Sequence, residues 1–163
     1  MSFIINNTLI GTQPIADNET VQRHPLGTIV TATSPTYGVG EFIYLKGVGS
    51  TVRGSAVTYN ADDFSTALLA ANAIGPVAIA MSACVADQFG WYQISGKAVV
   101  ASDAASDNAN CYIDGTSGRF DDAVVDGDMV HLAKYASADG TPSAGLAEVE
   151  IHRPYTDDIT TND

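Results

Sequence analysis

Short runs of β-forming residues recur along most of this chain, and glycine, proline or Asn/Asp-rich segments bound each of them. Beyond Gly38 the turn signals follow one another at intervals of roughly ten residues. The runs do not alternate with long amphipathic helices, so a parallel βαβ arrangement is not expected. The pattern predicts an all-β fold, namely a small antiparallel β-barrel or sandwich of roughly eight strands.

Two of the expected strands carry distinct burial patterns. Residues 76–81 alternate large and small apolar side chains, which indicates a strand buried on both faces. Residues 146–152 have a period of two, with Ala147, Val149 and Ile151 on the inner face. Further strands are expected at residues 27–32, 41–46, 55–59, 89–100, 110–113 and 129–135, with a small hairpin pairing 118–120 to 110–113.

Two positions are less regular than this pattern. Residues 62–74 fit a helical spacing of apolar side chains but also fit a strand that follows a polar loop, and both alternatives remain open. Gly96 lies in the middle of the 89–100 run, where a glycine marks a bulge or a close approach of another backbone.

The chain divides into three parts by composition. Residues 1–38 contain Pro14, Pro25 and Pro35 among short apolar groups, which predicts an extended N-terminal arm without a helix. Residues 39–155 form the expected β-barrel or sandwich domain. Residues 156–163 are polar and acidic, and we expect a flexible tail.

The charge balance excludes some classes of partner. Acidic residues number 19 and basic residues 7, which gives a formal net charge of −12 although only 16% of the chain is charged. So few cations cannot neutralise a phosphate backbone, so no nucleic-acid partner is expected. An anionic membrane surface would repel the chain, so no membrane partner is expected either.

Candidate chemistry in the sequence is weak. The glycine-rich residues 47–54 match neither the dinucleotide fingerprint nor the phosphate loop, and a turn is favoured. The acidic residues 121–128 lack the alternating spacing of a calcium loop, so a solvated turn is favoured over a metal site. His131, on an expected central strand, would need a partner such as an aspartate to serve a small hydrolase. We therefore expect no catalytic residue, metal or cofactor.

Three apolar positions each allow two interpretations. Cys84 and Cys111 lie in apolar runs and are expected to be reduced, buried thiols, with a mutual disulfide as the alternative. Trp91 suits either a core position or the anchor of an interface, because large amphipathic rings serve in both.

Four segments resemble parts of tailed-bacteriophage and prophage head proteins: residues 37–48, 75–81, 88–96 and 121–128. The third has the pattern Gly-Trp-x-Gln, then an apolar residue, and a glycine two positions further on. The resemblance covers about residues 26–154, and its motifs are turn glycines and core strands without catalytic residues. It implies a capsid decoration, or cement, protein: β-rich, often trimeric, and located on the outer capsid surface, where it bridges major capsid subunits.

This resemblance sets the functional expectation. The chain would be a structural virion protein and not an enzyme, and its partners would be the phage major capsid protein and other copies of itself, as a homotrimer. The arm would add a strand to an exposed sheet edge of a neighbour. A virion tip or fibre module that binds a host receptor or sugar is the alternative. The expected interface residues are Phe3, Ile4, Ile5, Leu9, Ile10, Pro14, Trp91 and Tyr92.

Overall fold

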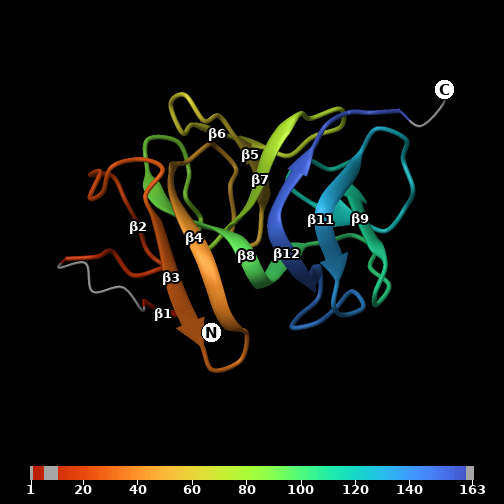
Figure 1. Cartoon of the computed structure of the whole chain (residues 1–163), viewed down its shortest axis with the longest axis horizontal. Coiled ribbons are helices and arrows are strands. Elements are labelled where there is room, and N and C mark those ends of the chain that lie inside the picture. Colours follow the sequence, from red (N-terminus) through yellow and green to blue (C-terminus); the bar gives the residue numbers. More distant parts are fainter. Residues whose placement is uncertain (1, 6–10, 161–163) are drawn as a thin grey trace.

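The computed structural model describes residues 2–5 and 11–160, and these residues form strands, turns and loops without a helix (Figure 1). This confirms the all-β prediction. The strands are β1 (Ile4–Ile5), β2 (Asn18–Glu19), β3 (Ile29–Ser34), β4 (Gly38–Lys46), β5 (Ala56–Tyr59), β6 (Thr66–Leu68), β7 (Gly75–Ala80), β8 (Phe89–Ala101), β9 (Asn110–Ile113), β10 (Phe120–Asp121), β11 (Met129–Tyr135) and β12 (Leu146–Thr156).

The strands form one antiparallel sheet in the order β1-β3-β4-β8-β7-β12-β11-β9-β10. Beside this path, β2 pairs with β8, β5 pairs with β7, and β6 pairs with β5. The sheet does not close on itself, so the barrel form of the prediction is wrong. The expected hairpin is present, because β9 and β10 pair with Phe120 opposite Ile113.

β8 is the longest strand, and it changes partner near its middle. Its first part pairs with β4 and its second part with β12, and the change falls at Gly96. Gly96 has a φ of +97°, and a Cβ there would lie 2.5 Å from the carbonyl oxygen of Val39. The β4–β8 register also shifts between Glu41 and Phe42. Of the two alternatives predicted at Gly96, the close backbone approach is therefore confirmed, while the bulge lies nearby at Ile94, between Gln93 and Ser95.

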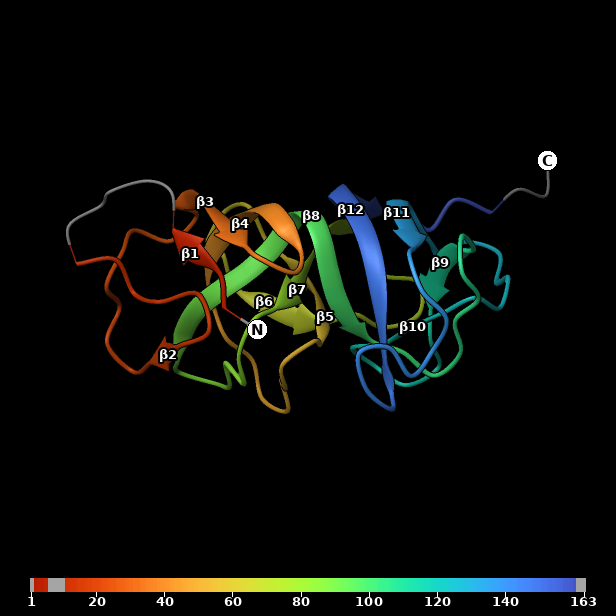
Figure 2. The same ribbon diagram turned by 90° about the horizontal axis from the view of Figure 1, so that it is seen from below.

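The change of partner along β8 divides the molecule into two lobes. The first lobe contains β1–β4 and residues 89–95, and the second contains β9–β12 and residues 97–101, with β5–β7 between them. Figures 1 and 2 show the two lobes toward opposite ends of the long axis.

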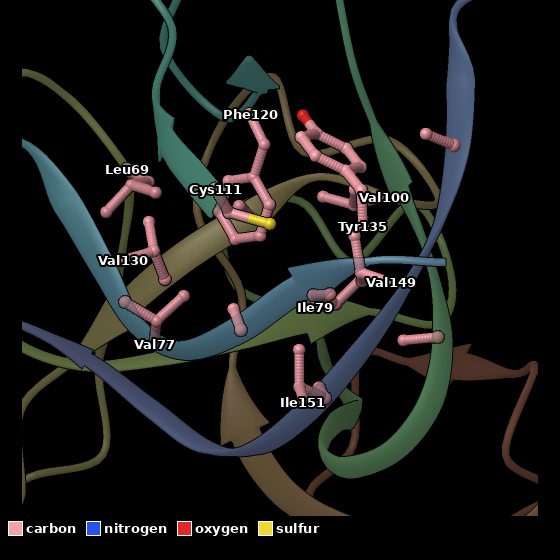
Figure 3. Close-up of a cluster of buried hydrophobic side chains, with 14 of the residues drawn as sticks. Leu69, Val77, Ile79, Val100, Cys111, Phe120, Val130, Tyr135, Val149 and Ile151 are labelled. Carbon is pink, nitrogen blue, oxygen red and sulfur yellow. The ribbon is translucent and has the colours of Figure 1, made fainter. Parts of the chain in front are cut away.

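Three clusters of buried side chains fill the interior. The aromatic cluster of the first lobe is built around Phe42, Tyr44 and Trp91. The middle cluster contains Tyr92 and Ile94. The C-terminal cluster is mostly aliphatic; its members include Leu69, Val77, Ile79, Val100, Cys111, Phe120, Val130, Tyr135, Val149 and Ile151 (Figure 3).

The alternation along β7 is explained by these clusters. Val77 and Ile79 lie in the C-terminal cluster, whereas Ala78 and Ala80 lie in the middle cluster. All four are buried, so the prediction of a strand covered on both faces is confirmed. Small alanines face the middle cluster because the ring of Tyr92 already fills that side.

Two other strand predictions are also settled. In β12, Ala147, Val149 and Ile151 are buried as expected, and the strand continues to Thr156. In the ambiguous segment, residues 66–68 form strand β6, paired with β5, and the helical alternative is wrong.

The described part of the N-terminal segment packs against the sheet. β3 pairs with β4 over six residues. Ile15, Val30 and Ala32 are buried in the aromatic cluster. The boundary expected at residue 38 falls in the β3–β4 hairpin, so residues 11–38 contribute to the same packed unit as the strands that follow.

Candidate functional site

The residues of β1 and its neighbours separate into an inner and an outer set. The rings of Phe3 and Phe42 meet edge to face with their centroids 4.8 Å apart, and Ile5 also packs on the aromatic cluster. Ile4 points to the opposite face, as alternation in a strand requires, and is 65% exposed. Pro14 is exposed in the loop before β2. Leu9 and Ile10 lie outside the described residues.

Ile4 belongs to a row of side chains across three strands. The register places it opposite Thr33 of β3, and Thr33 opposite Val39 of β4. Residues paired in this way point to the same face of a sheet. Val39 is 62% exposed. We call Ile4, Thr33 and Val39 the β1 surface: two exposed apolar side chains on either side of a threonine.

Trp91 and Tyr92 do not form a surface, and their assignment to an interface is corrected. Both side chains are completely buried. The indole Nε1 of Trp91 donates to the carbonyl oxygen of Gln13 at 2.9 Å, and the Tyr92 hydroxyl donates to the carbonyl oxygen of Cys84 at 3.5 Å. Burial raises the pKa of Tyr92. The receptor-binding alternative therefore has no exposed aromatic platform at these positions.

The loop before β3 explains why Trp91 is buried. The Tyr44 hydroxyl donates to Oε1 of Gln13 at 3.0 Å and accepts from the backbone N–H of Arg23 at 3.2 Å. The His24 ring lies 5.4 Å from that of Trp91, and burial together with the Arg23 charge lowers the pKa of His24. These contacts hold the mostly irregular segment around the short strand β2 over the aromatic cluster.

His131 does have an aspartate partner. In the β11–β12 pairing His131 stands opposite Tyr155, and the two rings stack with centroids 4.8 Å apart. Nε2 of His131 lies 3.3 Å from both carboxylate oxygens of Asp157, just beyond the end of β12. Neither Asp157 nor this pairing was expected from the sequence, because the two residues are 26 positions apart.

A groove of about 480 Å³ surrounds this pair, and we call it the His131 groove. Its lining includes Val124, which is 80% exposed, and Ile159, which is 65% exposed. The described lining contains no serine, threonine, cysteine or lysine, so the His–Asp pair has no such nucleophile to activate. The groove is therefore lined by apolar side chains such as Val124, Met129 and Ile159 together with the carboxylates of Asp126 and Asp157.

The acidic segment and the glycine-rich segment that the sequence analysis considered as binding sites are both turns with structural roles. In the acidic segment, the carboxylate of Asp128 is buried and accepts from the backbone N–H of Asn72 at 2.7 Å. No group of three or more potential metal ligands is found among the described residues. Residues 47–54 form successive turns, with Thr51 bonded to Val48 and Ser55 to Val52 through their backbones.

The two cysteines are free and buried, as expected. Cys84 lies in the middle cluster and Cys111 in the C-terminal cluster. Burial raises the pKa of both thiols, that of Cys111 to about 12. Each thiol is therefore a protonated, protected side chain in its own part of the core.

No known protein family model matches this chain, and no curated protein is significantly similar to it. Within residues 2–5 and 11–160, no helix has the length and apolar character needed to cross a bilayer. The strand content and the sheet topology define the class of the molecule: it is an all-β protein with one open sheet and two lobes.

Proposed function

We propose that this chain is a structural virion protein that binds the outer surface of a phage capsid and bridges subunits of the major capsid protein. One observation carries the proposal: each lobe has a surface with exposed apolar side chains close together, Ile4 and Val39 on the first and Val124 and Ile159 on the second. The β1 surface lies on the first lobe and the His131 groove on the second. A protein that bridges two subunits needs two such surfaces.

The sheet fixes the two surfaces relative to each other. β4 pairs with the first part of β8, and β12 pairs with the second part over seven residues, from Leu146 to His152. Because the lobes share this continuous strand, no free linker separates the surfaces. A rigid connection lets a bridging protein resist movement between the two subunits that it contacts.

The charge supports the same role. A net charge of −12 keeps free copies soluble and apart until a binding site is available. Asp126 and Asp157 line the His131 groove together with its apolar residues. The complementary capsid surface would therefore present apolar side chains with nearby lysines or arginines.

Binding to particles that lack the protein tests the proposal. Purified particles from a phage with the gene deleted are mixed with the protein and sedimented, and the bound amount is measured. Ile4→Asp and Val124→Asp each place a charge on one surface, and each should weaken binding by about tenfold or more. Ile74→Asp is the matched control, because Ile74 is 71% exposed but lies on neither surface.

Removing residues 1–24 is a poorer test, because the deletion also takes Gln13 and Ile15 out of the aromatic cluster. The point variants leave that cluster intact. The proposal is wrong if Ile4→Asp and Val124→Asp both bind particles as tightly as the unmodified protein.

A further inference from the structure

A cavity of about 520 Å³ opens where the two lobes meet. Its lining comes from both lobes: Thr36 and Tyr37 lie in the β3–β4 turn, and Pro142 and Ser143 lie in the loop between β11 and β12. Both of these connections lie along the lower edge of Figure 1. We call this space the seam cavity. Cavities at the junction of two structural units are common binding sites for small molecules.

The charged side chains that line the seam cavity already have partners. Nζ of Lys97 lies 2.5 Å from the Glu148 carboxylate, which raises the pKa of Lys97. Arg53 also takes part in an interaction of its own. No aspartate or glutamate is among the described lining residues. An ion that entered the cavity would therefore lose its hydration without gaining an unpaired counter-charge, so the site favours a neutral ligand.

Aromatic and aliphatic side chains supply much of the remaining wall. The rings of Phe3 and Tyr37 stack with their centroids 6.4 Å apart, and both line the cavity. Met81 and Leu146 lie in the same lining, and Met81 belongs to the aromatic cluster. Aromatic rings and a polarisable thioether make favourable contacts with a further aromatic ring. The walls therefore suit a ligand with an aromatic body.

One buried polar side chain in the lining has an unused acceptor. Gln93 is only 1% exposed, and its Nε2 donates to the carbonyl oxygens of Ser95 and Lys97, each at 3.1 Å. These two bonds use both N–H groups of the amide and fix the side chain before any ligand arrives, which lowers the cost of ordering on binding. No residue within 2–5 or 11–160 donates to Oε1 of Gln93. This oxygen is therefore available to a ligand that carries an N–H or O–H group.

We propose that the seam cavity binds a small, neutral aromatic molecule that carries an N–H or O–H group. The ring lies against Phe3, Tyr37 and Met81, and the N–H or O–H group donates to Oε1 of Gln93. This site is independent of the capsid-binding proposal, because it shares no described lining residue with the β1 surface or the His131 groove. A bound ligand contacts both lobes and therefore stabilises their junction.

The experiment is an NMR titration of the full-length protein with indole and with benzofuran, which has the same bicyclic shape but an oxygen in place of the N–H group. Indole should shift the backbone amide signals of Tyr37, Val99 and Ser143, which line the cavity from both lobes. Benzofuran should bind about fivefold more weakly, because it cannot donate to Gln93.

A variant of Gln93 tests the hydrogen bond separately from the packing. Gln93→Leu should remove the preference for indole over benzofuran, because the acceptor is gone. A merely structural role of Gln93 would weaken the binding of both probes and leave their ratio unchanged. Thermal unfolding checks that the variant is folded.

A second pair of variants locates the site even if Gln93→Leu does not fold. Ser143→Trp places a large ring in an exposed loop at the cavity and should block the binding of indole. Ser106→Trp is the matched control, because Ser106 is also exposed in a loop but does not line the cavity. It should leave the binding of indole unchanged.

Four outcomes would overturn the proposal. They are the absence of a shift of the seam signals up to about 2 mM indole, equal binding of indole and benzofuran, a preference for indole that persists in folded Gln93→Leu, and equal effects of Ser143→Trp and Ser106→Trp.

Discussion

The two lobes close their cores in different ways. In the first lobe, a mostly irregular segment that contains only the two-residue strand β2 covers large aromatic side chains, and polar contacts such as that from Trp91 to Gln13 hold it. In the second lobe, paired strands enclose mostly aliphatic side chains, among them Val130, Val149 and Ile151 (Figure 3). Aromatic residues with polar tips offer hydrogen-bond partners to a covering loop, whereas aliphatic residues do not.

The largest expected effect comes from removing the centre of the aromatic cluster. Trp91→Ala deletes a fully buried ring and its hydrogen bond to Gln13, and should lower the free energy of unfolding by about 3–5 kcal/mol. Urea unfolding measures this loss. Native-state alkylation of the thiols then reports where the structure loosens: Cys84 should gain reactivity more than Cys111.

Ile151→Ala provides the matched control in the other lobe, because Ile151 and Cys111 share the C-terminal cluster. It should expose Cys111 more than Cys84. If both variants expose both thiols equally, the cores of the two lobes do not differ in the way described.

The joint between the lobes should respond differently from either core. Gly96→Ala introduces a Cβ 2.5 Å from the carbonyl oxygen of Val39 at a φ of +97°, and should cost about 1–3 kcal/mol. Because β8 belongs to both lobes, the reactivity of the two thiols should rise together. A rise confined to one thiol would contradict the role of Gly96 as a shared joint.

Two tyrosine hydroxyls allow a finer comparison. Tyr44→Phe removes a partner of both Gln13 and Arg23, and leaving such groups unsatisfied should cost about 1–3 kcal/mol. Tyr135→Phe removes a 3.0 Å bond to the Ser102 hydroxyl, which still donates to Ala104, and should cost only about 0.5–1.5 kcal/mol. If urea unfolding shows that the two variants lose the same free energy of unfolding, the polar contacts that hold the covering segment of the first lobe are not as important as described.

The smallest effect is expected at Asp121 of the second lobe. Burial and the nearby Asp114 carboxylate raise the pKa of Asp121. A raised pKa in the folded state stabilises the protein at low pH, and this contribution disappears as the pH rises through that value. At pH 7 the charge is therefore unfavourable, and Asp121→Asn should raise stability by about 0.5 kcal/mol or less.

The pH dependence is the check for Asp121. The gain from Asp121→Asn should shrink as the pH is lowered, because the native carboxyl then becomes protonated. Asp107→Asn, in an exposed turn, should show no such trend. A gain that does not vary with pH would mean that the charge of Asp121 is not its cause.

The comparison also shows which features the sequence could predict. The alternations in β7 and β12 predict burial correctly, because packing on a sheet face imposes a period of two. The segment that covers the first lobe could not be predicted. It is held by individual hydrogen bonds, such as those of Gln13 with Tyr44 and Trp91, and such contacts produce no periodic pattern in the sequence. Trp91 remained ambiguous because its neighbours in sequence do not reveal whether a loop returns to cover it.

The candidate surfaces also differ in how much of them the sequence could predict. Alternation alone could have separated Ile4 from Phe3 and Ile5 once β1 was recognised as a strand. The His131–Asp157 pair required the β11–β12 register, which sequence spacing does not supply. One usable signal for the groove was the apolar run Ala123-Val124-Val125 between the acidic residues of this turn, because Val124 is among the exposed side chains.

The number of copies in each purified virion tests the central claim most directly. A protein that bridges subunits across a symmetric lattice should be present on the order of hundreds of copies per particle. A quantitative stained gel, calibrated against the major capsid protein, gives this ratio. A count of about a dozen or fewer would fit a tip or fibre module and would contradict the bridging role, since so few copies cannot occupy a repeated lattice site.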